Sequence, residues 1–407
     1  MITLALTSAY PKRKDDPTAP FIGSITEHVA ALGVTTHVVL PEHAEWARPR
    51  VEGRIHFHPY RYSPIRSWTP WGYAQSLEGG VKLRRQLYAV APAVYASARR
   101  TCLRLTSTVD VDLVHAHWLV PNGVIGASVA RRRDLPLVIS LHGSDVSIVE
   151  RKPWLAPLAR RAFGCAAVVT APSNDLLDRA SRLGARGDLK LMPYGAEYGE
   201  FAPDPEGARH LRQRYGFDAD DVVVLAVGRF VRWKGFDDLI ASIGRARTQN
   251  PELKLLLVGD GDLRSELERQ AADLDAQAVT FAGVVTRDEI NAYFQASDLV
   301  AVPSVHADGF VDGQPNVALE AMAAGKPLVV TNVGGLPALV DGGQNGFIVD
   351  ERDPRALADA LLSLAAAPDR RIAMGVAGQT RIRDELNWNE YARRLLEIYA
   401  AAVGGSR

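Results

Sequence analysis

Short, almost continuously apolar runs alternate with helical patterns along nearly the whole chain, and this alternation limits the possible folds more than any other feature. Apolar strands separated by helices indicate parallel sheets that are covered on both faces. The sequence therefore predicts an α/β protein with two doubly wound sheets in series. A ligand cleft is expected where the carboxyl ends of the strands face each other.

The boundaries of the predicted elements follow from the apolar periodicity. In the first half we expect strands at Ile2–Thr7, Thr35–Leu40, Leu113–Ala116, Leu137–Leu141 and Ala167–Ala171, and helices at about 23–32, 82–104, 122–132, 155–163 and 174–183. In the second half we expect strands at Val222–Val227, Lys254–Val258, Val279–Ala282, Leu299–Val302 and Leu328–Thr331, and helices at about 236–248, 263–274, 287–296 and 316–324. The Pro-rich stretch Phe201–Pro205 predicts a linker between a domain at 1–200 and a domain at 201–387.

The charge of the chain is balanced in total but uneven along its length. Residues 1–200 hold 25 basic and 17 acidic side chains, and the remainder holds 22 and 30. The basic half either attracts the acidic half or faces an anionic partner, such as a membrane surface or a phosphorylated acceptor. Its basic residues are not interleaved with stacking aromatics, so no nucleic-acid partner is expected.

Signs of secretion or of a membrane span are missing from the sequence. No apolar run reaches the roughly 18 residues of a membrane span. The start, MITLALTSAYPKRK, places its charges after a short apolar run, which is the reverse of a secretory signal. Cys102 and Cys165 cannot form a disulfide framework. We therefore expect a cytoplasmic protein, and the basic half leaves open a peripheral position at the inner face of the cytoplasmic membrane.

The segment Asp308–Gly335 carries two carboxylates, Asp312 and Glu320, with seven residues between them. Pro315 is well placed for the first turn of a helix that Gly325 ends. The backbone amides at the start of that helix would form a site for anions and hydroxyls. They belong to Gln314, Asn316 and Val317. One carboxylate could then bind sugar hydroxyls and the other a ribose diol, and a plain helix with an acidic start is the alternative.

Basic side chains follow the first strand of the second half. In Val227–Gly235, whose sequence is VGRFVRWKG, Arg229 and Lys234 can converge on one diphosphate, and Arg232 is a rival candidate. Two fixed cations there would neutralise the charge that develops as a nucleoside diphosphate leaves. The tight turn Gly259–Asp262 could let a base or ribose approach the backbone, although it lacks the pattern of a dinucleotide site.

Four polar residues of the first half are expected at the ends of two neighbouring strands. His115 and His117 end one strand, and His142 and Asp145 follow the next, so all four side chains should point toward the cleft. A metal site is one interpretation, but two histidines on an uncharged strand do not favour it, and we expect no metal. Hydrogen-bonded imidazoles in the core, or a contact from His142 to a substrate hydroxyl, are the alternatives.

The segment from about 60 to 81 has five aromatic residues among prolines, arginines and a glycine pair, with no regular period. These residues are Tyr60, Tyr62, Trp68, Trp71 and Tyr73. They either pack over the core or form an acceptor-binding or interfacial surface, because aromatic rings suit both sugar faces and the depth of lipid headgroups.

Taken together, these motifs resemble the retaining glycosyltransferases of family 4, which have the GT-B architecture. In the second half the resemblance rests on VGRFVRWKG, LLLVGDG, FAGVV, the D-x7-E segment with EAMAAGKP, and the closing VGG. In the first half VHAHWLVPNG, SLHGSD, VTAPS and LMPYGAEYGEF follow in the expected order. The loop with Arg61, Tyr62, Gly79 and Gly80, together with the motif HGSDV, looks like the exopolysaccharide and lipopolysaccharide branch.

The resemblance implies that a sugar passes from a UDP- or GDP-sugar to a glycan, lipid-linked or small-molecule acceptor, in cell-surface polysaccharide synthesis. The anomeric configuration would be retained, with no cofactor beyond the donor and no protein nucleophile. It also implies two Rossmann-like domains, the first for the acceptor and the second for the donor, with a last helix at about 388–407 that crosses back to the first.

The resemblance also implies roles for single residues. Arg229 and Lys234 match the residues that bind the diphosphate. Asp312 matches the first acid of the family's E-x7-E motif, which holds the sugar hydroxyls, although it is one methylene shorter than the usual Glu. Glu320 matches the second acid, on the donor ribose, and His142 matches the histidine near the transferred sugar.

The remaining expected contacts are weaker. On the donor side they are the Gly23 amide at the diphosphate, Val284 near the base, and Gly313 beside the first acid; on the acceptor side they are His117, Asp145, Trp71 and Tyr73. Two other functions remain open at this point. One is a nucleotide-sugar epimerase on the same scaffold, and the other is a non-catalytic nucleotide- or glycan-binding relative.

Overall fold

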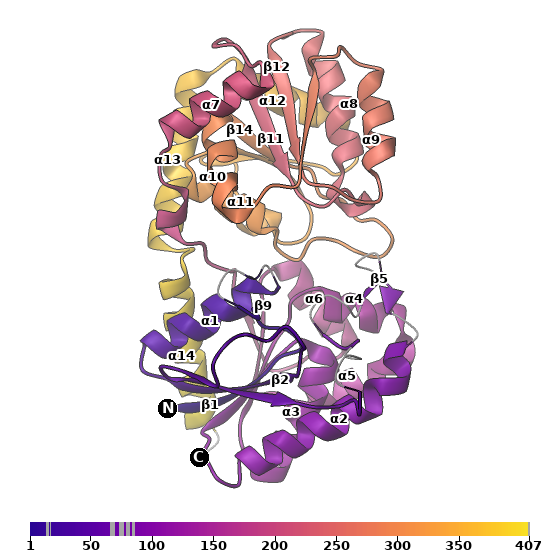
Figure 1. Cartoon of the computed structure of the whole chain (residues 1–407), viewed down its shortest axis with the longest axis vertical. Coiled ribbons are helices and arrows are strands. Elements are labelled where there is room, and N and C mark those ends of the chain that lie inside the picture. Colours follow the sequence, from indigo (N-terminus) through magenta and orange to yellow (C-terminus); the bar gives the residue numbers. More distant parts are fainter. Residues whose placement is uncertain are drawn as a thin grey trace. The chain divides into compact units, whose positions relative to one another are not determined.

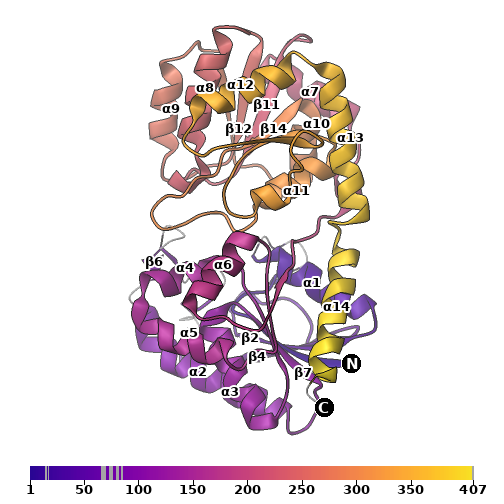
Figure 2. The same ribbon diagram turned by 180° about the vertical axis from the view of Figure 1, so that it is seen from behind.

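The computed structural model describes residues 1–405 apart from 14, 15, 17, 66–69, 73–76, 79–81, 84 and 85. The chain divides into two compact units. The first comprises Met1–Met192 with Trp388–Arg407, and the second comprises Pro193–Asn387. Figures 1 and 2 show each unit as a sheet with helices on both of its faces. The prediction of two doubly wound α/β sheets is therefore confirmed.

Within the described ranges, the main sheet of the first unit has the order β10-β9-β8-β7-β1-β2-β4-β3. Its strands are β1 (Ile2–Leu6), β2 (Thr35–Pro41), β3 (Val51–Glu52), β4 (Ile55–Tyr60), β7 (Leu113–His117), β8 (Leu137–Ser140), β9 (Val168–Ala171) and β10 (Asp188–Leu191). A short antiparallel ladder joins β5 (Leu77–Glu78) to β6 (Lys82–Leu83). The strand order reverses between β1 and β7, which pair in parallel, so the two loops that follow these strands flank the expected ligand position.

Helices cover both faces of this sheet. They are α1 (Pro20–Ala31), α2 (Gln86–Leu105), α3 (Val124–Arg133), α4 (Ser144–Arg151), α5 (Ala156–Phe163), α6 (Asn174–Leu183) and α14 (Trp388–Gly404). The last helix, α14, packs against α1 and β7, while α3 packs against α2 and α5. The prediction that the last helix returns to the first unit is confirmed.

In the second unit the strand order is β13-β12-β11-β14-β15-β16, and the paired strands are parallel throughout the part that the structure describes. These strands are β11 (Val222–Val227), β12 (Leu253–Val258), β13 (Val279–Gly283), β14 (Leu299–Val302), β15 (Leu328–Thr331) and β16 (Gly346–Val349). The order reverses between β11 and β14. The loops after these two strands are therefore the ones expected to hold a ligand.

The helices of the second unit also form two layers. They are α7 (Pro205–Tyr215), α8 (Phe236–Arg247), α9 (Arg264–Ala272), α10 (Arg287–Ala296), α11 (Asn316–Ala323), α12 (Pro354–Ala365) and α13 (Pro368–Asp384). On one face α8 packs against α9 and α12, and their apolar residues share one core cluster with β11 and β12. Elsewhere α7 packs against α10, and α11 packs against α13.

All ten predicted strands exist, and three of them have the observed bounds: Val222–Val227, Leu299–Val302 and Leu328–Thr331. Six described strands were not predicted: β3, β5 and β6, which have two residues each, and β4, β10 and β16. The sequences of β4 and β10, IHFHPY and DLKL, mix polar and apolar residues, and β16 is a partly exposed edge strand. Apolar periodicity thus revealed the central strands, whose residues are apolar on both faces, whereas of the edge strands it found β13 and missed β3, β10 and β16.

The boundary between the units lies before Pro193, which is earlier than the linker predicted at Phe201–Pro205. The backbone N–H of Tyr194 donates to the side-chain oxygen of Gln314 at 2.9 Å, so this segment already belongs to the second unit. Pro205 is the first residue of α7. The proline marks the start of a helix, where its missing N–H is tolerated, and not a free linker.

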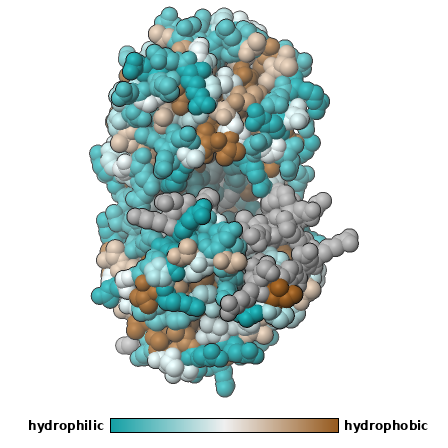
Figure 3. Space-filling view, in the orientation of Figure 1, coloured by the Kyte–Doolittle hydropathy of each residue, from teal (hydrophilic) through white to brown (hydrophobic). Residues whose placement is uncertain are grey.

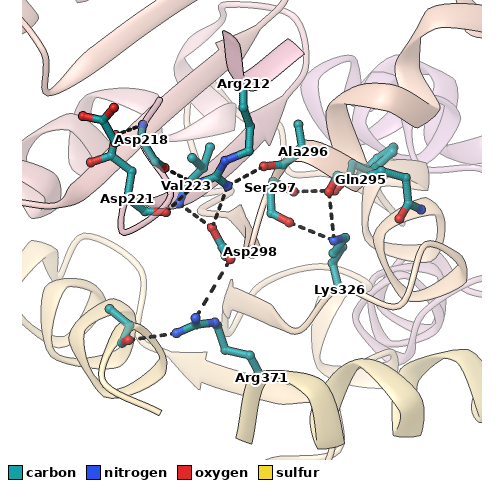
Figure 4. A network of polar contacts seen from close by, with 12 residues as sticks. Arg212, Asp218, Asp221, Val223, Gln295, Ala296, Ser297, Asp298, Lys326 and Arg371 are labelled. Carbon is teal, nitrogen blue, oxygen red and sulfur yellow. Dashed lines mark hydrogen bonds and ion pairs between the residues drawn. The ribbon is translucent and has the colours of Figure 1, made fainter. Parts of the chain in front are cut away.

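A polar network joins the amino ends of β11 and β14 in the second unit (Figure 4). The carboxylate of Asp298, just before β14, accepts the backbone N–H of Val223 at 2.8 Å. It also lies 3.4 Å from a guanidinium nitrogen of Arg212 and 3.9 Å from one of Arg371. One carboxylate thus joins α7, α13 and the two central strands.

The guanidinium of Arg212 extends the network into the surrounding loops. It donates to the backbone carbonyls of Asp221 at 2.6 Å, Asp218 at 2.9 Å and Ala296 at 3.0 Å. These carbonyls lie before β11 and at the end of α10, outside the regular hydrogen bonds of strand and helix. The network therefore stabilises the amino ends of the sheet.

Within the described residues, no helix is both long enough and apolar enough to span a bilayer. The longest one described, α2, has 20 residues but carries Arg99, Arg100 and Arg104.

Candidate functional site

An ion pair lies at the carboxyl ends of the two central strands of the second unit. The ammonium of Lys234, in the loop after β11, lies 2.8 Å from a carboxylate oxygen of Asp312, in the loop after β14. The hydroxyl of Ser304 donates to the same oxygen at 2.6 Å. Both ionic side chains are 16% exposed, so the pair is sheltered but open to a ligand. The sequence placed these two residues at one site but did not predict that they pair.

Close backbone contacts hold the Lys234 loop. Gly235 has a φ of 64°, and a Cβ at this position would lie 2.0 Å from the carbonyl oxygen of Pro303, which follows β14. Any side chain there would clash with this backbone, so glycine lets the two loops touch. The contact brings Lys234 beside the segment that carries Ser304.

The closing glycine pair does the same for the acidic loop. A Cβ on Gly334 would lie 1.9 Å from the carbonyl oxygen of Asp312, and a Cβ on Gly335 would lie 2.1 Å from that of Gly313. The loop after β15 therefore packs directly on the backbone of Asp312. Three loops, each following a strand of the sheet, fix the Lys234–Asp312 pair.

Arg229 also follows β11, with its guanidinium 5.6 Å from the ring centre of Trp233, which lies 5.3 Å from the ring of Phe310. A Cβ on Gly259 would lie 1.9 Å from the carbonyl oxygen of Gly228. The turn predicted to admit a base or ribose is thus packed against the chain's own backbone, and it supports the Arg229 loop.

The rival cation, Arg232, has a different environment. It lies 3.5 Å from Glu266, and the two side chains are 53% and 49% exposed. Exposed pairs of this kind contribute little, because water and salt screen them. Arg229 is exposed as well, so among the three cations only Lys234 is sheltered, and Arg232 pairs with an exposed carboxylate.

The helix α11 is preceded by Pro315, which lies at the N-cap position with φ −69° and not in the first turn as predicted. Proline suits this end because its ring fixes φ. Glu320 lies inside the helix, with its carboxylate 3.8 Å from Arg287, which also pairs with Glu200. Burial raises the pKa of Glu320, and the positive charge of Arg287 opposes that rise.

Arg287 was not among the residues predicted from the sequence. Its position three residues after Val284, at the start of α10, was the available signal, because the loop after β13 was already assigned to the donor side. Val284 itself is 77% exposed.

The residues at the start of α11 differ in burial and in what their side chains contact. The side-chain oxygen of Gln314 accepts the N–H of Tyr194 at 2.9 Å and is buried, so this side chain holds the adjoining segment. Val317 is buried, whereas Asn316 is exposed. Because the side chain of Gln314 is already engaged, only its backbone remains to contact a donor.

In the first unit, an imidazole pair lies after β7 and β8. His117 Nδ1 lies 3.2 Å from His142 Nε2. The rings of Phe21 and Trp118 lie 5.0 and 4.8 Å from that of His142. Burial lowers the pKa of His117 to about 3 and that of His142 well below its usual value. Both imidazoles are neutral at pH 7 and can exchange hydrogen bonds but carry no charge.

The structure does not bring all four predicted polar residues to a ligand site. His115 Nδ1 lies 2.7 Å from the hydroxyl of Tyr399, and Nε2 lies 2.7 Å from that of Ser140. This side chain points into the core, toward the face of β7 against which α14 packs. The interpretation as a hydrogen-bonded core imidazole applies to His115, and its expected place in the cleft was wrong.

Asp145 is buried in α4 and contacts backbone groups. Its carboxylate accepts the N–H groups of Leu119 at 2.7 Å and Gly143 at 3.0 Å. Burial raises the pKa of Asp145, and these hydrogen bonds oppose that rise. In the part of the chain that the structure describes, no three His, Cys, Asp or Glu side chains are grouped as metal ligands.

Two further predicted residues lie near β1. Gly23 is the fourth residue of α1 and is buried, and a Cβ at this position would lie 3.2 Å from the ring of Pro11. The helix starts at Pro20, so the expectation that Gly23 stands at the helix start was wrong. Trp71 is partly buried, and its backbone N–H donates to the hydroxyl of Tyr62 at 2.8 Å. Tyr73 lies outside the described residues, as does Trp68.

The loop after β7 has an unusual backbone. Trp118 has a φ of 68°, which is uncommon for a residue with a side chain. Its N–H donates to Ser140 at 2.9 Å and its carbonyl accepts from Gly123 at 3.0 Å. Such strain persists where surrounding contacts impose it and is typical of ligand-binding positions.

Two family models match the chain, one in each half. Residues 18–195 match the family model described as "Glycosyl transferase 4-like domain", and residues 221–367 match the one described as "Glycosyl transferases group 1". The two matched ranges contain the imidazole pair and the Lys234–Asp312 pair, respectively.

Curated relatives and solved structures point the same way. The chain is 34% identical over 304 residues to the GDP-mannose-dependent alpha-(1-6)-phosphatidylinositol monomannoside mannosyltransferase of Mycolicibacterium smegmatis, covering 72% of this chain and 78% of that protein. It is 29% identical over 370 residues to the putative teichuronic acid biosynthesis glycosyltransferase TuaC of Bacillus subtilis, covering 89% and 88%. The structure of Anabaena HepE in complex with UDP-glucose has a TM-score of 0.74 and 21% identity, covering 98% of this chain and 100% of HepE.

Proposed function

The chain belongs to the group 1 glycosyl transferases, the family 4 enzymes with the GT-B fold, and from that premise we propose that it transfers a sugar from a UDP- or GDP-sugar to a lipid-linked or glycan acceptor. The observation that carries the proposal is the Lys234–Asp312 pair, at 2.8 Å, beside the reversal of strand order in the second unit. A cation and a carboxylate fixed side by side suit a donor that carries a diphosphate next to a ring of hydroxyls.

The charges at this position account for donor binding. The ammonium of Lys234 has three protons, so it can keep its bond to Asp312 while donating to a phosphate oxygen. Arg229 supplies a second cation from the same loop. Asp312 then accepts hydrogen bonds from the sugar hydroxyls, and Glu320, held beside Arg287, accepts them from the ribose.

The reaction requires one bond to break and one to form. The bond between the anomeric carbon and the β-phosphate oxygen breaks, and the acceptor oxygen bonds to that carbon from the same face, so the configuration is retained. The acceptor proton passes to the departing phosphate oxygen. Lys234 and Arg229 stabilise the negative charge that grows on the diphosphate. The proposal needs no protein nucleophile and no cofactor beyond the donor.

The relatives support the classes of donor and acceptor. The name of the mycolicibacterial relative specifies GDP-mannose and a phosphatidylinositol mannoside, and the HepE structure holds UDP-glucose. The Bacillus relative is named for teichuronic acid biosynthesis. We therefore propose a role in making cell-surface glycans from a nucleoside diphosphate sugar.

An assay of nucleotide release tests the proposal. The protein is incubated with UDP-, GDP- and ADP-sugars, with and without lipid extracts as acceptors, and the released nucleotide and the sugar product are measured. Release that depends on acceptor and is lost in Lys234→Ala, but kept in the exposed-lysine control Lys190→Ala, supports transfer. A changed sugar without release would indicate an epimerase, and binding without turnover a non-catalytic relative. Either outcome would contradict the proposal.

A peripheral membrane position forms part of the same proposal. The 25 basic against 17 acidic side chains of residues 1–200 would attract an anionic surface. We expect sedimentation with phosphatidylglycerol vesicles that weakens as salt rises, because salt screens charges beyond about a Debye length. Sedimentation that does not change with salt would exclude an electrostatic attachment.

A further inference from the structure

The first unit contains a large cavity whose lining is mainly apolar. Its volume is about 710 Å³, within the range of small-molecule sites. The cavity lies among α2, α3, α4 and α5 and the loops after β1 and β7. Its lining includes Phe21, Leu87, Trp118, Ile148, Trp154 and Leu158. The cavity therefore stands beside the reversal of strand order in the first unit, where a ligand is expected.

The polar groups of the lining offer little to a sugar. Besides tyrosines and tryptophans, the polar side chains of the lining are those of Ser8, Thr18, Ser144 and Asp145. The carboxylate of Asp145 already accepts the N–H groups of Leu119 and Gly143. These groups would replace few of the hydrogen bonds to water that a ring of hydroxyls would lose in such a space, whereas a hydrocarbon chain would lose none. The chemistry of the lining therefore favours an apolar occupant.

Large apolar side chains stand partly in solvent at the cavity. Tyr88, Trp154 and Leu158 line it and are 44%, 58% and 41% exposed. The rings of Tyr88 and Trp154 lie 6.3 Å apart. On the face of the molecule in Figure 3 hydrophilic residues predominate and apolar ones occur in separate patches. Side chains that line a cavity and also reach solvent mark its entrance.

The entrance is flanked by positive charge. The segment Arg151–Arg161, with sequence RKPWLAPLARR, holds four basic residues, no acidic ones, and two of the exposed apolar side chains. Basic residues on both sides of an exposed tryptophan and leucine suit the boundary between an anionic lipid surface and its acyl region. The charge of this segment complements the phosphate groups of a lipid surface outside the entrance, and not the polar group of the bound ligand.

The other end of the cavity meets the imidazole pair. Trp118 lines the cavity, and its ring lies 4.8 Å from that of His142. The strained backbone of Trp118 is therefore shared between the apolar space and the neutral histidines. A molecule with an apolar chain in the cavity would present its polar group to these histidines.

We propose that this cavity holds the hydrocarbon chain of a lipid acceptor. The chain passes Tyr88, Trp154 and Leu158, and the polar group that receives the sugar lies at Trp118 and His142. This inference rests on the proposed function for the role of the ligand as acceptor, and it adds the class of that acceptor.

Calorimetric titration with hexyl, octyl and decyl phosphate, each below its micellar concentration, tests the proposal without a known acceptor. If each added methylene is buried in the cavity, the affinity should rise roughly fourfold per methylene. An affinity that does not change with chain length would overturn the proposal.

A matched pair of variants on α2 tests the place of binding. Ala91 lines the cavity, whereas Ala96 is exposed on the same helix. Ala91→Phe should weaken decyl phosphate binding at least tenfold, and Ala96→Phe should leave it unchanged. If Ala91→Phe does not fold, Trp154→Ala, at an exposed entrance residue, should still weaken binding several-fold. Equal effects of the two phenylalanine variants, or none from either Ala91→Phe or Trp154→Ala, would overturn the proposal.

Nucleotide titrations separate the failure of this inference from that of the proposed function. Binding of UDP or GDP without binding of alkyl phosphates would overturn the cavity assignment alone. Binding of alkyl phosphates without any binding of nucleotides would support the cavity and contradict the transferase. Vesicle binding that weakens with salt, without any binding of alkyl phosphates, would mean that the segment Arg151–Arg161 contacts a lipid surface but no lipid chain enters the cavity. That result would also overturn the inference.

Discussion

The two ends of the second unit's sheet both carry ion pairs, but they differ in what those charges contact. At the amino ends, Asp298 binds Arg212, Arg371 and the N–H of Val223. Arg212 in turn donates to backbone carbonyls of the surrounding loops. At the carboxyl ends, Lys234 and Asp312 bind each other on loops that glycine contacts hold together. An ion pair alone therefore does not mark a site.

The position in the sheet distinguishes the two ends. Charges at the amino ends bind carbonyls and amides that the chain itself leaves incomplete, so they contribute to stability. Charges at the carboxyl ends lie beside the reversal of strand order, where a ligand is expected. Substitutions at the amino ends should therefore mainly lower stability, whereas substitutions at the carboxyl ends should mainly lower activity.

The largest effect is expected at the carboxyl ends. Lys234→Ala and Arg229→Ala should each lower turnover by two to three orders of magnitude, or roughly 2.7–4 kcal/mol, because each removes a charge that stabilises the departing diphosphate. Arg229→Ala should change the melting temperature little, because this side chain is exposed. Lys234→Ala leaves the sheltered carboxylate of Asp312 without its cation and should also lower the free energy of unfolding by about 1–3 kcal/mol. Nucleotide release and thermal unfolding measure the two quantities. A loss of turnover below tenfold in both variants would remove the assignment.

The reverse pattern is expected at the amino ends. Arg212→Ala removes the partner of Asp298 and of three backbone carbonyls, so the free energy of unfolding in urea should fall by about 1–3 kcal/mol. Turnover of the folded variant should stay near that of the wild type. Arg214→Ala, at an exposed arginine of the same helix, is the control and should change neither quantity. A loss of activity greater than the loss of stability would break the contrast between the two ends.

Lowering the pH tests the imidazole pair at the carboxyl ends of the first unit's sheet, because it should reduce the stability of the fold. The pKa of His117 is about 3 in the folded protein, against about 6.5 in the unfolded chain. The folded state thus binds fewer protons below pH 6.5. The contribution to stability is fully present above pH 6.5 and is lost as the pH falls toward 3, by about 1.4 kcal/mol per pH unit.

Urea unfolding at about pH 7.5 and about pH 5.5 measures this effect. His117→Asn should make the pH dependence shallower, whereas His210→Asn, at an exposed histidine, should leave it unchanged. An unchanged slope in His117→Asn would show that this imidazole is not held neutral.

The smallest effect on stability is expected for Glu320→Gln. Burial raises the pKa of Glu320 in the folded state, so its contribution to stability is complete below about pH 4.5 and is lost as the pH rises through the folded value. At neutral pH the variant should be as stable as the wild type or up to about 1 kcal/mol more stable. Its affinity for UDP or GDP should nevertheless fall several-fold.

Thermal unfolding and nucleotide titration test both halves of this expectation, with the exposed Glu397→Gln as control. If the melting temperature fell together with the affinity, Glu320 would be an ordinary helix residue with a structural role, and the contrast between the two ends would fail there.

The sequence predicted most of the buried architecture and only part of the site. Ten strands were found because residues buried on both faces are apolar at nearly every position. Lys234, Asp312 and Glu320 were assigned to one site by their motifs. Their direct partners were not: Ser304 contacts Asp312 and Arg287 contacts Glu320, and only for Arg287 did the sequence offer a signal, its place shortly after Val284.

The errors have a common physical cause. His115 and His117 look alike in the sequence, yet one bonds to Tyr399 in the core and the other to His142. Gln314 was assigned by its place at a helix start, but its side chain holds Tyr194. In each case a contact between residues far apart in the chain decided which polar group was available.

By itself, the sequence determined which residues stand at the ends of strands, because apolar periodicity marks where each strand stops and the next loop begins. Only the tertiary structure decided which of those loops meet. β11 lies beside β14 and not beside β13, and Gly235 and Gly334 let the backbones of their loops touch. Strand order and backbone contact are long-range properties, so Lys234 and Asp312, distant in sequence, became one ion pair only on folding.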